Sequence, residues 1–222
     1  MAEARSFATI RGAGAVEINR VLRNTYLLLG MTLAFSAVVA TVAYATGAPH
    51  LGFFPTLIGF FAVLFLVHRT ANSVWGLPAV FLFTGFLGYT LGPLLSVYLA
   101  LPNGATLVGH ALGLTAIAFI GLSGYALVSR RDFSYLRGFL VTGCLVLLGG
   151  MLLNYFLALP VMSVAISCGV VLFACALILF ETSAVVQGGE TNYIRATVGL
   201  YVSIYNLFVS LLQLLGIFGG DD

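Results

Sequence analysis

Seven long apolar stretches, separated by short polar breaks, constrain this 222-residue chain more than any other feature of its sequence. An α-helix needs about 20 mostly apolar residues to cross a bilayer, and each stretch is close to that length. Only 7% of the residues are charged, which is too few to cover a soluble domain. We therefore predict an all-α integral membrane protein, a bundle of seven transmembrane helices. The predicted spans are 25–46, 51–67, 77–100, 105–128, 136–158, 161–186 and 195–218.

The nine basic residues are all arginines, and their positions predict the orientation of the chain. They precede the first span or lie around the breaks after spans two, four and six. With a cytoplasmic N-terminus, all of them lie on the cytoplasmic side, as the positive-inside rule requires. The predicted parts are a flexible cytoplasmic tail over 1–24, a seven-helix domain over 25–218 and a short periplasmic tail over 219–222.

The same composition excludes several classes of function. A basic face with interleaved aromatic residues, which would indicate nucleic-acid binding, is missing from the sequence. The three cysteines have no metal-ligand spacing, so we predict no metal site and no cofactor. The lipid bilayer is the first expected partner, and the oligomeric state stays open.

Glycines recur at the spacing that lets two helices approach closely in a membrane. We expect them to lie where helices pack, and the seventh span to lie at the centre of the bundle. The glycines in question are Gly88 and Gly92 in the third span, and Gly109, Gly113, Gly121 and Gly124 in the fourth.

One ionisable residue, Glu181, lies well inside a predicted span. A charged side chain within the membrane is costly and therefore suggests a functional site. The alternative is that Glu181 reaches the interface or ties the sixth span to a loop arginine. Arg69, at the inner end of the second span, is a plausible cationic partner.

The seventh span carries a polar stripe at steps of three and four residues, formed by Ser203, Asn206, Ser210 and Gln213. Such a face must point to protein or water, because lipid cannot satisfy its hydrogen bonds. Two interpretations stay open: hydrogen bonding between helices, and a pore or proton path. Ser203 and Glu181 are expected at compatible depths.

A GxSG motif around Ser123 matches the nucleophile motif of rhomboid-type intramembrane proteases. That chemistry needs a histidine within hydrogen-bond reach of the serine. His110 lies ~20 Å away along the same span, which leaves only His68. A serine protease is therefore a remote alternative, and we predict that the chain is not an enzyme.

Five segments carry a resemblance to a known family. The chain resembles the Bax inhibitor/YccA family, the transmembrane Bax-inhibitor-motif proteins, and most closely its bacterial YccA-type members. The segments are 83–93 (FTGFLGYTLGP), 129–136 (SRRDFSYL), 178–182 (ILFET), 188–197 (GGETNYIRAT) and 200–208 (LYVSIYNLF).

The resemblance implies a seven-helix bundle in a bacterial inner membrane, with the seventh helix in the middle. The calcium-leak members of the family resemble pH-gated channels, in which acids on spans six and seven share a proton and latch to an arginine on span two. By position these residues correspond to Glu181, Ser203 and Arg69. Since Ser203 is not acidic, any pH sensing would depend on Glu181 alone.

YccA-type members are instead associated with the membrane-anchored AAA protease FtsH, whose attack on other membrane proteins they modulate. The resemblance therefore implies a regulatory protein of membrane-protein quality control, with an FtsH-type protease as partner. The alternative is a pH-sensitive calcium leak channel or proton-coupled ion transporter that uses Glu181, with calcium as a possible transported ion.

Overall fold

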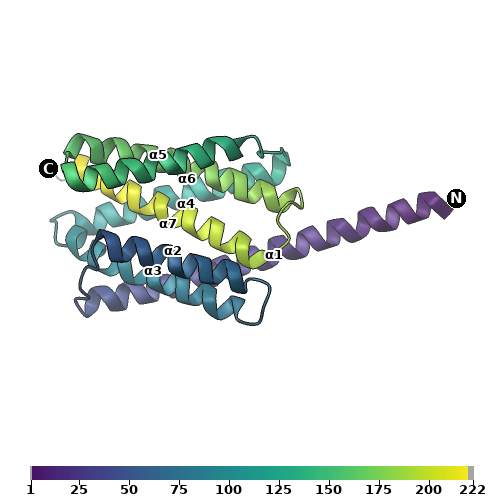
Figure 1. Ribbon diagram of the computed structural model, residues 1–222, viewed down its shortest axis with the longest axis horizontal. Coiled ribbons are helices and arrows are strands. Elements are labelled where there is room, and N and C mark those ends of the chain that lie inside the picture. The colour runs from purple at the N-terminus through teal and green to yellow at the C-terminus, as the bar shows by residue number, and fades with distance from the viewer. Residues whose placement is uncertain (1, 220–222) are drawn as a thin grey trace.

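The predicted spans are helices in the computed structural model, which describes residues 2–219, with side chains from 16 to 219 (Figure 1). Each of the seven helices is long and apolar enough to cross a membrane. All helix boundaries except the start of the first agree with the predicted spans to within three residues. The helices are α1 (Ala2–Ala45), α2 (Phe53–Thr70), α3 (Gly76–Leu99), α4 (Gly104–Ser129), α5 (Leu136–Leu157), α6 (Pro160–Val186) and α7 (Tyr193–Phe218).

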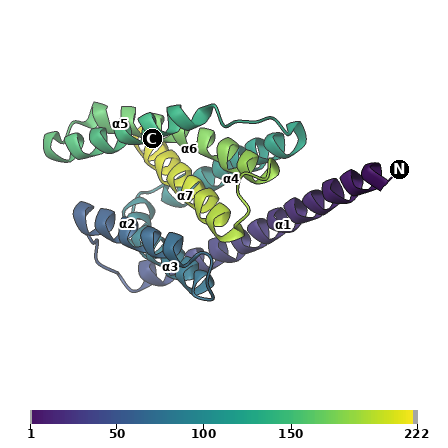
Figure 2. The same ribbon diagram turned by 45° about the vertical axis from the view of Figure 1, so that its right-hand side comes forward.

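The first helix is longer than its predicted span. The part of the helix over Val16–Ala45 is apolar enough to cross a membrane, and the helix continues without a break back to Ala2. Residues 2–24, predicted as a flexible tail, therefore belong to α1, and their outer part projects away from the bundle (Figures 1 and 2). The polar residues before Thr25 predict where the apolar span begins, but they do not predict where the helix begins. Ala, Arg and Glu are good helix formers in water as well, so the helix can extend beyond the apolar span. Asp221 and Asp222, at the end of the predicted C-terminal tail, lie outside the described residues.

The seventh helix lies in the middle of the bundle, as predicted (Figure 2). It packs against α1, α3, α4 and α6, whereas α2 packs mainly on α3 and α5 mainly on α6. One buried cluster joins α7 to the first three helices and includes Leu28, Phe83 and Tyr201. A second cluster joins α7 to α4 and α6 and includes Ile178 and Leu207. The seventh helix thus connects two groups of helices that share few other contacts.

The predicted glycine packing is confirmed in α3 and wrong in α4. A Cβ atom on Gly88 would lie 2.6 Å from the carbonyl oxygen of Ser36, and one on Gly92 would lie 2.9 Å from the carbonyl carbon of Ala43. These two glycines allow α1 and α3 to approach backbone to backbone. The four glycines of α4 that we expected to pack have open space where a Cβ would project, because their face points out of the bundle. They are Gly109, Gly113, Gly121 and Gly124.

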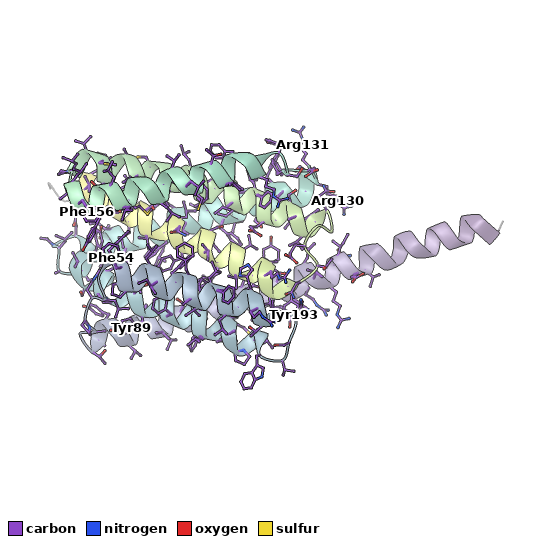
Figure 3. All side chains as sticks on the ribbon, viewed as in Figure 1. Phe54, Tyr89, Arg130, Arg131, Phe156 and Tyr193 are labelled. Carbon is purple, nitrogen blue, oxygen red and sulfur yellow. The ribbon has the colours of Figure 1, made fainter. Side chains whose placement is uncertain are left out.

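The two ends of the bundle differ in chemistry. Figure 3 places Arg130 and Arg131 at the end from which α1 projects, and Phe54 and Phe156 at the opposite end. There, Tyr155 at the end of α5 stacks on Phe53 of α2, with ring centroids 5.0 Å apart. We refer below to the end that carries Arg130 and Arg131 as the arginine end.

Candidate functional site

The carboxyl group of Glu181 lies on the backbone of α7. A Cβ atom on Gly199 would lie 2.5 Å from Cδ of Glu181 and within 2.8 Å of both of its carboxyl oxygens. A larger residue at this position would displace the carboxyl group. The side chain of Glu181 is partly buried and lies between α6 and α7.

Ser203 lies one turn further along α7, on the same helical face as Gly199. Its hydroxyl donates to the carbonyl oxygen of Gly199 at 2.9 Å, and the residue is 0% exposed. Glu181 and Ser203 therefore both contact Gly199, at the compatible depth that the sequence predicts. The sequence of α7 contains no acidic residue, so this site holds one carboxyl group beside a hydroxyl rather than a pair of acids.

Asn206 and Gln213 of the polar stripe make hydrogen bonds inside the protein. The amide of Asn206 donates to the carbonyl oxygen of Val202 at 2.9 Å. Oε1 of Gln213 accepts from the hydroxyl of Ser167 on α6 at 2.9 Å, and Ser210 is buried. These contacts favour the packing interpretation of the stripe, because the polar groups of Ser203, Asn206 and Gln213 already have protein partners.

Arg69 is placed away from Glu181. It is exposed in the last turn of α2, a helix that packs mainly on α3, whereas Glu181 lies on α6. Arg195, which we expected at the break before α7, lies in the first turn of that helix, one turn before Gly199. Its Nε is buried and has no hydrogen-bond partner among the described residues.

Asn192 ties the start of α7 to the loop that follows α2. Its side chain accepts from the backbone N–H groups of Ile194 and Arg195, which caps α7, and donates to the carbonyl oxygen of Ala71 at 3.0 Å. The backbone N–H of Asn192 donates to a carboxyl oxygen of Glu190 at 2.8 Å. Sequence reasoning missed this role, although an asparagine just before an apolar helix is a recognisable N-cap signal.

Two tyrosines on the opposite face of α7 were also missed. The hydroxyl of Tyr201 pairs with that of Ser36 on α1 at 2.5 Å and donates to the carbonyl oxygen of Thr84 on α3 at 3.3 Å. The hydroxyl of Tyr205 pairs with that of Thr90 on α3 at 2.8 Å. Their spacing of four residues places both on one helical face, which is the signal that was available.

Ser123 of the GxSG motif is buried among three helices. Its hydroxyl pairs with those of Tyr26 on α1 and Thr182 on α6. His68 is exposed near the end of α2, where Nδ1 lies 2.9 Å from the carbonyl oxygen of Leu64. The structure therefore does not bring the proposed serine and histidine together, and Ser123 connects helices instead.

Most of the chain is similar in sequence to a family of known proteins. The family model described as "Inhibitor of apoptosis-promoting Bax1" matches residues 18–220. An Escherichia coli protein named "Modulator of FtsH protease YccA" is 50% identical over 203 residues, which cover 91% of this chain and 92% of that protein. A Pseudomonas aeruginosa protein of undescribed function is 53% identical over 206 residues, 93% of each chain. A membrane protein of Vibrio cholerae is 43% identical over 208 residues, again 93% of each chain.

Proposed function

This chain belongs to the Bax inhibitor family, and we propose that it is a regulatory protein of the bacterial inner membrane that modulates an FtsH-type AAA protease. The observation that carries the proposal is the similarity over nine-tenths of both chains to a relative named as a modulator of that protease. The proposed orientation has the arginine end in the cytoplasm, in accordance with the positive-inside rule.

Two features of the fold support this role. The outer part of α1 projects from the arginine end, where a cytoplasmic ATP-driven protease would reach it (Figure 2). The membrane part of α1 packs closely on α3 through Gly88 and Gly92, so the bundle resists extraction. A protein that is engaged at its end but released slowly would occupy the protease and slow its attack on other membrane proteins.

A reconstitution tests the proposal. An FtsH-type protease is placed in proteoliposomes with a membrane substrate, and the rate of substrate loss is measured with and without this protein. We expect the full chain to slow the loss and a variant lacking residues 2–15 to have no effect. A control variant replaces residues 2–15 with an equally long helix of another sequence. An unchanged rate with the full chain, at ratios where the two proteins co-purify, would refute the proposal.

The role proposed here is not enzymatic. A protease of the rhomboid type needs a general base at its serine. The hydroxyl of Ser123 is instead paired with those of Tyr26 and Thr182. Ser123→Ala is therefore expected to change the stability of the bundle and to leave any proteolysis in the assay unchanged.

A second candidate, an ion pathway, is favoured by the carboxyl group of Glu181 inside α6. It is tested by calcium influx into liposomes at about pH 6 to 8, where groups that sense physiological pH titrate. A pH-dependent leak that Glu181→Gln abolishes would make ion flux the primary function. Influx no greater than that of empty liposomes would exclude it.

A further inference from the structure

A hollow of about 300 Å³ opens at the arginine end between α1, α4 and α6. It lies where α4 ends at Ser129 and α6 ends at Val186. The ends of spanning helices lie near the headgroups of the bilayer, so this hollow faces the phosphate and glycerol region of the lipid. Its six lining residues are Ile18, Asn19, Leu22, Leu127, Arg130 and Val186.

The lining combines an apolar floor with one cation, Arg130, and one amide, Asn19. Leu22, Leu127 and Val186 come from three different helices, and Arg130 lies at the rim with its side chain exposed. Among the described residues that line this hollow, none is acidic. A smaller hollow of about 120 Å³, which Ile18 also lines, contains the acidic residues Glu17 and Glu190 in its lining.

The backbone that carries Arg130 is held in place by α6. Arg130 ends α4 in the left-handed conformation, with φ of 49°, which is uncommon for a residue other than glycine. Its carbonyl oxygen accepts from the side-chain amide of Gln187, and that of Arg131 accepts from the hydroxyl of Ser183 at 2.9 Å. The cation is therefore attached to a fixed loop rather than to a mobile one.

The nearest acidic residue along the chain is Asp132, two residues beyond Arg130. Asp132 is exposed, and its carboxyl group accepts from the backbone N–H of Ser134 at 2.8 Å, within its own loop. An occupant of the hollow thus meets a guanidinium at the rim and aliphatic side chains below it. Basic pockets between helices on the cytoplasmic side of a membrane suit anionic lipid headgroups.

We propose that this hollow binds one anionic phospholipid, with its phosphate at Arg130 and the start of its acyl chains against Leu22, Leu127 and Val186. The headgroup phosphate of a lipid matches the charge of Arg130, and its acyl chains match the apolar floor. Lipid also surrounds this part of the bundle. The site is independent of protease modulation and of the carboxyl group of Glu181.

Native mass spectrometry tests the proposal on the full-length protein. Protein stripped of lipid in a non-ionic detergent is titrated with phosphatidylglycerol, with phosphatidylcholine or with inorganic phosphate. We expect one phosphatidylglycerol to bind more tightly than phosphatidylcholine. Arg130→Gly keeps the left-handed backbone and removes the cation, so it should weaken phosphatidylglycerol binding about five-fold and leave phosphatidylcholine binding unchanged.

Two further variants separate the cation from the floor. Val186→Phe fills the hollow and keeps the guanidinium, so it should weaken the binding of both lipids. Arg137→Gln is the matched control, because it removes an exposed arginine at the same end from a residue that does not line the hollow. Circular dichroism and melting temperature confirm that each variant is folded.

Four results would overturn the proposal. Equal losses in Arg137→Gln and Arg130→Gly would show diffuse attraction to the surface. Equal binding of the two lipids would show that the cation has no role. Displacement of phosphatidylglycerol by an equal concentration of inorganic phosphate would show a simple anion site. A co-purifying polypeptide that is lost in Arg130→Gly would assign the hollow to a protein partner.

Discussion

The third and fourth helices carry glycine pairs at the same four-residue spacing, yet the two pairs have opposite surroundings. Gly88 and Gly92 of α3 lie against the backbone of α1, whereas Gly109 and Gly113 of α4 face out of the bundle. The four-residue spacing allows a close contact between helices, but the contact forms only where another helix lies against the glycine face. Gly199 is a third case, since its neighbour is the end of a flexible side chain rather than a backbone.

The largest effect is expected where backbone meets backbone. Replacing both Gly88 and Gly92 with Ala forces α1 away from α3, and overpacking of this kind costs about 3 kcal/mol. The measurement is the free energy of unfolding in detergent micelles under increasing sodium dodecyl sulfate, followed by circular dichroism. An unchanged unfolding curve would contradict the close contact between α1 and α3.

A smaller effect is expected at Gly199. In Gly199→Ala the new Cβ displaces the carboxyl group of Glu181, which can move because it ends a flexible side chain. The cost is about 1 kcal/mol and is partly offset by the better helix propensity of alanine. The more sensitive measurement is the labelling rate of Glu181 by an apolar carbodiimide, which should rise. Glu181→Gln is the control, and it should remove this labelling.

The face of α7 opposite to Glu181 provides a test that involves no glycine. Tyr201→Phe removes the hydroxyl that contacts Ser36 and Thr84, and hydrogen bonds between membrane helices contribute about 0.6 kcal/mol on average. A double-mutant cycle with Ser36→Ala isolates the contact. Strictly additive losses would mean that the two hydroxyls do not interact.

An effect of the opposite sign is expected in α4. Gly113→Ala places a methyl group in open space and should stabilise the helix by at most about 1 kcal/mol. The same unfolding measurement applies, repeated at several protein concentrations. A loss of stability that depends on concentration would contradict this prediction and show that the glycine face of α4 is buried between two copies of the chain.

The helices and the central place of α7 follow from sequence, because apolar length and a polar stripe are local patterns. Ser203 and Glu181 meet at Gly199 for the same reason: their depths are set by their positions along two neighbouring helices. Features that depend on which helices pack against each other could not be predicted from the sequence. The outward-facing glycines of α4, and the placement of Arg69 on a helix that packs mainly on α3, belong to this group.

The unbroken course of α1 has a mechanical consequence. At 1.5 Å per residue, its 44 residues form a rod ~66 Å long that begins beyond the arginine end of the bundle and runs to the opposite end. A force that pulls on the outer end of α1 acts along the axis of the helix. It therefore acts parallel to the contact between α1 and α3, and does not separate the two helices one turn at a time. The contacts of Ser36 with Gly88 and of Ala43 with Gly92 therefore bear such a force together, and both must break before α1 moves along α3.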